Sequence, residues 1–200
     1  MRITLTVFLV SLTLLVHGQQ KKTYFPAWTF QQKNINIYGV SAGLWNFTND
    51  PQNTSSNGLR FSLIGEGIVV ALAPRSPIAE SDNLFQSIID EPISERVNGI
   101  SLPGTGNAGS YEINGVAIGL VGHLHNSVNG ISVAAMINAA QRHNGIQTTL
   151  FMNQCYQMNG IQVGIFNTSK KTRGFQIGLW NVNERRKLPL INWNFGSKNS

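Results

Sequence analysis

The sequence has a single cysteine, few charged residues and no long apolar stretch after its first positions. Cys155 is the only cysteine in 200 residues, so no disulfide within the chain stabilises it, even in an oxidising compartment. Charged residues make up 12% of the chain, and no segment beyond residue 16 approaches the roughly 20 apolar residues of a membrane-spanning helix. Stability must therefore come from packing and hydrogen bonding.

Acidic residues are nearly missing from the carboxy-terminal part. Eight of the nine acids lie at or before Glu112, and only Glu184 follows it, against eight basic residues. An exposed basic surface attracts polyanions in a salt-dependent way, and a solvated face without a ligand has the same composition. The candidate partners are anionic glycans or lipid headgroups rather than nucleic acid. We interpret six residues as a candidate anion-contact surface: Lys170, Lys171, Arg173, Arg185, Arg186 and Lys187.

The first 18 residues have the three parts of a cleavable signal peptide. Arg2 gives a positive start, residues 3–16 are apolar and uncharged, and Val16-His17-Gly18 offers a small residue at the cut. The apolar part, about 14 residues, is short for a membrane anchor. Without a cysteine near the junction, a lipid anchor is not expected. We expect an exported protein, either released or held at the cell surface or outer membrane.

An internal repeat of about 15 residues organises the rest of the chain. Asn-Gly steps, with Arg-Gly in the last unit, place glycines 16, 15, 15, 15 and 14 residues apart, at Gly99, Gly115, Gly130, Gly145, Gly160 and Gly174. Counted from each glycine, positions one, three and five are mostly large and apolar, whereas positions two and four are small or polar. This alternation predicts strands with the apolar side buried and the polar side wet. An Asn suited to turns closes each strand.

The same pattern occurs nearer the amino terminus, around Gly39 and Gly58. We therefore expect an amino-terminal extension at 19–34, β repeats at 35–73 and 98–195, and a carboxy-terminal tail at 196–200. Residues 74–97 interrupt the repeat with three prolines and most of the acids. We interpret them as an irregular excursion with a short helical turn at 83–89.

Two all-β architectures accommodate the repeat. In a parallel β-solenoid each unit makes one coil, and equal positions stack on one another. In an antiparallel meander or an outer-membrane β-barrel each unit is one strand and a turn, and strands of about nine residues suit such a barrel. Alternate turns would then lie at opposite ends, and nothing would require them to resemble each other. The constant phase of the repeat favours the solenoid.

Two late segments carry a family resemblance. Residues 159–167 (NGIQVGIFN) and 173–181 (RGFQIGLWN) resemble the repeat of bacterial surface-repeat proteins of spirochaetes and Bacteroidetes. Residues 181–193 are similar to the closing segment of that family, and 57–77 to its amino-terminal portion. The resemblance implies an exported surface or outer-membrane protein of a Gram-negative bacterium. It implies no activity, so it assigns no functional residues.

Motifs with catalytic or binding chemistry are weak. The glycines of residues 104–109 match G-x-G-x-x-G, but a strand rather than a helix is expected to follow, so we interpret the segment as a turn. His123 and His125 are interpreted as surface side chains at a strand end, because a metal would need a third ligand. Cys155 is interpreted as a packed or idle thiol. We expect no catalytic residue, cofactor or metal.

Aromatic or long apolar residues recur at the sixth position, at Met136, Phe151, Phe166 and Trp180. Internal packing is favoured for them, and an exposed stacking ladder or lipid-facing surface is the alternative. Paired acids occur only within the excursion, where a solvated loop is the expected state.

Three functions follow from these expectations. The first is an exported cell-surface repeat protein with a structural or binding role and no catalytic activity. The alternative is an integral outer-membrane β-barrel that serves as a pore or anchor. The third, which the absence of acidic clusters in the repeats disfavours, is a secreted enzyme acting on polysaccharide.

Overall fold

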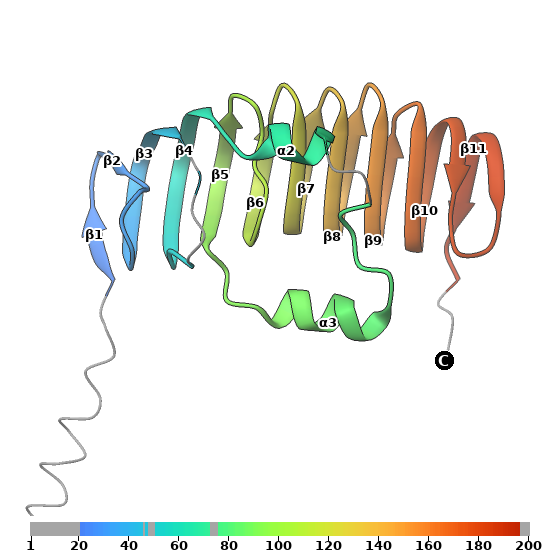
Figure 1. Ribbon diagram of the computed structural model, residues 1–200, viewed down its shortest axis with the longest axis horizontal. Coiled ribbons are helices and arrows are strands. Elements are labelled where there is room, and N and C mark those ends of the chain that lie inside the picture. The colour runs from blue at the N-terminus through green and yellow to red at the C-terminus, as the bar shows by residue number, and fades with distance from the viewer. Residues whose placement is uncertain (1–20, 46, 48–50, 73–75, 197–200) are drawn as a thin grey trace, which may run out of the picture.

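The chain winds into a parallel β-solenoid, as a computed structural model describes for residues 21–45, 47, 51–72 and 76–196 (Figure 1). The predicted signal peptide at 1–18 lies outside these residues. The strands are β1 (Lys22–Tyr24), β2 (Ala27–Thr29), β3 (Ile35–Trp45), β4 (Thr54–Ile64), β5 (Glu95–Pro103), β6 (Tyr111–Ile118), β7 (Gly122–Ala134), β8 (Ile137–Thr149), β9 (Met152–Val163), β10 (Phe166–Val182) and β11 (Lys187–Asn194).

Equal positions of successive repeats are partners in the sheet. Strands β3 to β10 pair in sequence order and in parallel, and their Asn-Gly corners align from one strand to the next. The predicted solenoid is therefore confirmed, and the antiparallel meander or barrel does not form. The strands run through the Asn-Gly step, which had been expected to separate them. Each coil thus has a leading side before the glycine and a trailing side after it.

The corner glycines are required by the close approach of successive coils. Gly145 has φ +132°, and a Cβ atom there would lie 2.1 Å from the carbonyl oxygen of Gly130. Only glycine adopts this conformation without strain, and no side chain fits so near the neighbouring backbone. This stacking of glycines in successive coils explains the regular glycine spacing in the sequence.

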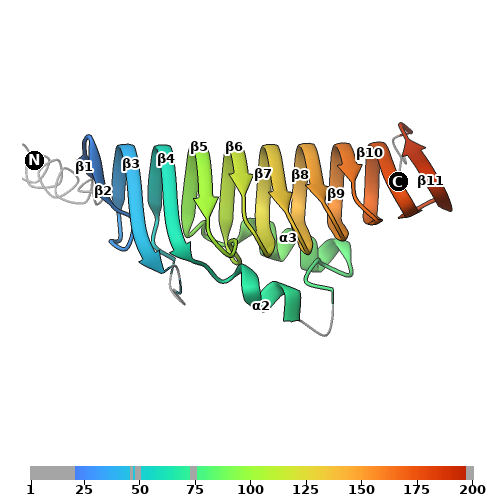
Figure 2. The same cartoon turned by 90° about the horizontal axis from the view of Figure 1, so that it is seen from above.

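Two short helices lie between β4 and β5, and the first of them occupies residues 67–72, which had been predicted as β repeat rather than excursion. They are α2 (Gly67–Leu72) and α3 (Asp82–Asp90), which contains the helical turn predicted at 83–89. Ser81 caps α3 by accepting a hydrogen bond from the backbone N–H of Leu84. Phe85 of α3 stacks on Tyr156, on the leading side of β9. Both helices lie on the same side of the row of strands (Figure 2).

The two ends of the stack are built differently from its middle. At the amino-terminal end, β1 and β2 both pair in parallel with β3. At the carboxy-terminal end, β11 turns back and pairs antiparallel with β10. It carries Pro189, which lacks a backbone N–H, and it begins at Lys187. Proline and lysine on an edge strand oppose the addition of another strand, so this end is protected against end-to-end association.

The trailing half of each coil has a polar interior, which corrects the predicted orientation of the strands, whereas the leading half buries an apolar cluster with Val97, Ile113, Val128 and Met158. Positions two and four after the glycine point inward, and the large apolar positions one, three and five point outward. Ser132, Gln147, Gln162 and Gln176 are fully buried, whereas Ile131 is 38% exposed. The alternation was predicted correctly, but the face that it buries was not.

Stacked amides hold this polar interior. Gln162 donates to Gln147 Oε1 at 2.8 Å, and Gln176 donates to Gln162 Oε1 at the same distance. A second column begins at the inner asparagines, where Asn153 Nδ2 donates to Asn167 Oδ1 at 2.8 Å and also to the Val163 carbonyl across the coil. These bonds satisfy polar groups that would otherwise be costly to bury.

The inner amides also explain the glycines at position four. A Cβ atom at Gly164 would lie 2.7 Å from Nδ2 of Asn153, and one at Gly178 would lie 2.6 Å from Nδ2 of Asn167. The space inside a coil is thus filled by the amide that crosses it. A side chain at Gly164 or Gly178 would therefore displace the amide beside it.

A further column of asparagines lines the corner between the two sides. Asn98, Asn114, Asn129, Asn144 and Asn159 each donate to the Oδ1 of the preceding asparagine, over 2.7 to 2.9 Å. The column begins at Asn57, which donates to the Ile37 carbonyl. In the last coil Arg173 takes the equivalent position and ends it.

Candidate functional site: an uncovered apolar face

The outward positions of the trailing side form a continuous surface, which we call the apolar face. It comprises Val40, Ala42, Leu44, Leu59, Phe61, Leu63, Ile100, Leu102, Val116, Ile118, Leu120, Ile131, Val133, Ala135, Ile146, Thr148, Leu150, Ile161, Val163, Ile165, Phe175, Ile177, Leu179, Ile191 and Trp193. None of these residues is buried. All are uncharged, and Thr148 alone carries a polar side chain other than the indole of Trp193.

The face is regular because its rows follow the strand register. Position one runs from Val40 on β3 through Ile131 on β7 to Phe175 on β10, and Trp193 of β11 extends it. Nine strands at about 4.8 Å and five residues at about 3.3 Å give a length of roughly 43 Å, a width of roughly 17 Å and an area of about 700 Å². The largest apolar patch on a typical monomer is about 300–600 Å² and is often functional.

Aromatic and long apolar side chains follow the face along one rim. Met136, Phe151, Phe166 and Trp180 at position six are 37–49% exposed. The internal packing favoured for them is therefore wrong. Phe151 and Phe166 meet edge to face, with ring centroids 5.4 Å apart. The rim is an exposed ladder, so it widens the apolar surface.

The six predicted anion-contact residues gather at the carboxy-terminal end, but several are engaged within the chain. Lys171 Nζ lies 2.6 Å from Asp82 Oδ1 on α3. Arg186 donates from Nε to Asn192 Oδ1 at 3.0 Å and from Nη2 to the Trp193 carbonyl at 2.7 Å, and it stacks on the Trp193 ring. Lys170, Arg173, Arg185 and Lys187 are exposed.

An acid lies within this basic region. Glu184 Oε2 accepts a hydrogen bond from the backbone N–H of Thr172 at 3.0 Å, and its other oxygen accepts one from Asn194. This carboxylate ties the turn after β10 to the strand that carries Lys171 and Arg173. The two halves of the basic region are thus brought together around a negative charge, which weakens their attraction for an anion.

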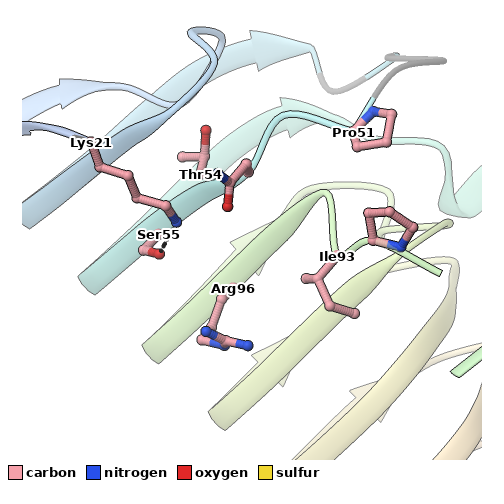
Figure 3. A pocket seen from close by; sticks show the side chains of 8 residues that line it. Lys21, Pro51, Thr54, Ser55, Ile93 and Arg96 are labelled. Atoms are coloured by element: carbon pink, nitrogen blue, oxygen red, sulfur yellow. Dashed lines mark hydrogen bonds between the residues drawn. The ribbon is translucent and has the colours of Figure 1, made fainter. Parts of the chain in front are cut away.

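A pocket of about 290 Å³ lies at the other end of the molecule (Figure 3). Lys21, Ser55, Ile93 and Arg96 help to line it. Lys21 donates to Ser55 Oγ at 3.1 Å, and burial, followed by the charge of Arg96, lowers the pKa of Lys21. Arg96 donates twice to one oxygen of Glu112, at 3.0 and 2.8 Å. The cations of the pocket are therefore held by partners in the chain.

The three histidines of the repeat region are interior residues, which corrects the surface positions predicted for His123 and His125. All three are 0% exposed. His123 accepts at Nδ1 from the backbone N–H of Asn107 and lies 3.1 Å, through Nε2, from the Val133 carbonyl. Burial lowers the pKa of His123 to about 4 and that of His143 to about 3. These imidazoles are neutral packing groups at neutral pH.

A buried ion pair adjoins the histidines. Arg60 Nε lies 2.9 Å from Glu95 Oε2, and the guanidinium stacks over Phe30 at 4.2 Å. Both charged side chains are almost entirely enclosed, and Glu95 also accepts from Ser56 at 2.7 Å. The pair therefore fastens β4 to β5 within the stack. Within the described ranges, no three His, Cys, Asp or Glu side chains are placed to hold a metal ion.

The remaining motifs resolve into structural parts. Residues 104–109 form a turn that leads into β6, as interpreted. Cys155 is fully buried on β9, and burial raises the pKa of its thiol. Asp82 accepts from Tyr156 and pairs with Lys171, and these two hydrogen bonds lower the pKa of its carboxyl.

Comparison with known proteins leaves the structure as the basis for assigning a function, because no family model, curated protein or solved structure matches this chain. Helices α2 and α3, of 6 and 9 residues, are too short to cross a bilayer, and the described part of the chain contains no longer helix that could. The apolar face is the candidate site that the sequence did not predict. Its signal was the regular return of Gln and Asn at alternate positions, which stacked amides inside a coil require.

Proposed function

We propose that this protein is an exported, non-catalytic scaffold that binds a partner through the apolar face. One observation carries the proposal: about 700 Å² of regular, uncharged apolar surface, by strand spacing, lies on the trailing side of the coils, whereas α3 packs against the leading side. Burial of apolar area contributes about 25 cal/mol per Å². A face of this size supplies enough gross stabilisation for a specific complex.

The face is suited to binding because it is already ordered. Its backbone groups are paired within the sheet, and its β-branched side chains have few rotamers to lose. The stacked amides beneath it hold the rows in register. A partner that covers the face therefore gains apolar burial at little cost in conformational entropy.

The side chains with the chemistry for catalysis are buried or engaged in contacts within the chain. The histidines are enclosed, the Cys155 thiol is buried, and Asp82 is bound by Tyr156 and Lys171. These engagements support a binding role over the polysaccharide-active enzyme. Export and a surface location remain part of the proposal and derive from residues 1–18.

Photo-crosslinking on intact cells tests this function. The photoreactive residue p-benzoylphenylalanine replaces Ile131 in the centre of the face, or the more exposed Val69 on α2 as a control. We expect a crosslinked product from position 131 and none from position 69. Equal products from both positions, or none from position 131, would show that the face is not a binding surface.

Export has a separate readout. Amino-terminal sequencing of the protein recovered outside the cytoplasm should give Gln19 as the first residue. Retention of residues 1–18 in the cytoplasmic fraction would refute export and leave the binding role to be judged by the crosslinks alone.

A further inference from the structure

The apolar face repeats at the spacing of the strands, about 4.8 Å along the solenoid axis. The side chains of position one stand in one row and those of position three in the next, about 6.6 Å away, and within each row the side chains recur at the strand spacing. A rigid surface with the same period fits such a face best, because its side chains enter the gaps between neighbours all along a row. The chain itself supplies one such surface.

The estimated area of the apolar face agrees with self-association of the chain. About 700 Å² per copy is close to the roughly 800 Å² that each partner buries in a standard stable interface. Two such faces packed at the usual sheet separation of about 10 Å would form an apolar layer between two solenoids. No described residue of the face carries a charge that such a layer would leave buried and unpaired.

The distribution of charge favours the same arrangement. The chain has a formal net charge of +6, so the preferred packing of two copies is the one that keeps their basic residues far apart. Lys171 lies on the leading side beside Asp82 of α3, away from the apolar face. Face-to-face packing therefore turns this part of the basic region outward. An anionic bilayer is the poorer match, since the basic residues described beside the face gather at its carboxy-terminal end, where Arg186 stacks on Trp193, and do not line its length as they line membrane-binding surfaces.

The structure of the ends of the stack favours a closed dimer over an open chain of copies joined end to end. Strand β11, with Pro189 and Lys187, opposes the addition of a strand at the carboxy-terminal edge. Growth by end-to-end stacking is therefore hindered. Packing of face on face uses the same surface in both copies and closes after two.

We propose that the partner of the apolar face is a second copy of this chain, bound face to face about a two-fold axis. This inference rests on the proposed function and names its partner. β7 is the middle strand of the nine from β3 to β11. Val133 of β7 therefore lies opposite Val133 of the other copy or close to it.

Sedimentation equilibrium of the mature chain, residues 19–200, gives the first test. At micromolar concentration the mass should be twice that of the monomer. A variant carrying Ile118→Lys and Ile146→Lys, at positions 43% and 40% exposed, should raise the dissociation constant at least roughly 100-fold, because the ammonium groups would be buried. A control carrying Val69→Lys and Leu72→Lys on α2, 58% and 77% exposed, has the same added charge and should remain a dimer. Circular dichroism checks that both variants are folded.

Crosslinking of Val133→Cys with a short bis-maleimide gives the second test. A product of twice the chain mass is expected, while Val69→Cys should give none; the buried Cys155 does not compete. A wild-type chain that is monomeric at all concentrations and forms no such product overturns the inference.

The outcomes of these experiments distinguish a wrong partner from a wrong proposed function. A photo-crosslink from position 131 to a different protein retains the proposed function but refutes the second copy. Flotation of the monomer with phosphatidylcholine–phosphatidylglycerol vesicles, abolished by the Ile118→Lys, Ile146→Lys variant, would replace the second copy with a lipid surface. Absence of every adduct from position 131 refutes both.

Discussion

Acid should destabilise the fold at a pH well above the titration of ordinary carboxylates, because three histidines lie inside the coils. Burial lowers the pKa of His123 to about 4 and that of His143 to about 3. Burial, and then the charges of His123, His143 and Arg60, lower the pKa of His125 well below its ordinary value. The buried carboxylate of Glu95 is bound to Arg60. Each imidazole is therefore neutral in the folded chain.

The direction of the pH dependence of stability follows from these pKa shifts. A folded-state pKa below the unfolded value means that the unfolded chain takes up protons first as the pH falls. Stability is thus complete above about pH 7 and declines from about pH 6.5 down to the folded pKa. At about pH 5, with an unfolded pKa of about 6.5, His123 and His143 each remove about 2 kcal/mol, or about 4 kcal/mol together. His125 acts in the same direction. The sum is large against a typical stability of about 5–15 kcal/mol.

Urea unfolding followed by circular dichroism at several pH values between about 7.5 and 5 measures this loss. The His143→Met variant isolates one group, because the neighbouring residues of its column are Val128 and Met158, and Ser132 keeps its bond to Asn138. As the pH falls, the free energy of unfolding of this variant should fall less steeply than that of the wild type, because its unfolding takes up about one proton fewer. An unchanged slope in this variant, or equal stability of the wild type at both ends of the range, would refute buried neutral histidines.

Three further predictions concern the interior. Gly145→Ala should lower the free energy of unfolding by about 3 kcal/mol, clearly more than Gly109→Ala. Gly109 also has a positive φ, but a Cβ atom there would meet nothing nearer than 3.7 Å. Equal losses in urea unfolding would contradict the steric role of the corner glycines. Gln162→Leu should remove about 2 kcal/mol by leaving the Gln147 amide oxygen without its donor, whereas Gln157→Leu on the leading side should change stability by less than about 0.5 kcal/mol. Cys155 should react with a maleimide only after unfolding by urea, and labelling of the native chain measured by mass spectrometry would show that the thiol is accessible.

Much of the fold was predictable from the repeat. The glycine period predicted the length of one coil, although the Asn-Gly step was expected to separate strands rather than to lie within them. The constant phase of the repeat favoured parallel stacking over an antiparallel meander. Both inferences concern backbone geometry, which leaves a direct trace in spacing.

The orientation of the strands was not predictable from hydrophobicity. Alternation shows that two faces differ, but the inward face is chosen by the width of the coil. Here Asn153 crosses the interior to the Val163 carbonyl and fills the space beside Gly164. A side chain of the size of Ile161 has no room at that position. The positions of the histidines follow from the same inversion, because His123 belongs to the column of the inner asparagines.

The return of β11 also left no periodic signal. Residues 187–194 contain no glycine, and antiparallel pairing with β10 does not require the repeat. Their role as an end strand depends on Pro189 and on the edge that β10 would otherwise expose.

The direction of the amide columns bears on how such a chain can change in length. Each corner asparagine donates toward the amino-terminal neighbour, whereas Asn153 and Asn167 donate toward the carboxy-terminal one. A coil inserted or deleted whole restores every donor and acceptor in both columns, but a partial coil breaks both. Length therefore varies in whole coils, each adding about 80 Å² of outward apolar surface, or about 2 kcal/mol of gross burial. Duplication of one coil would strengthen contact in a fixed increment without altering any other part of the molecule.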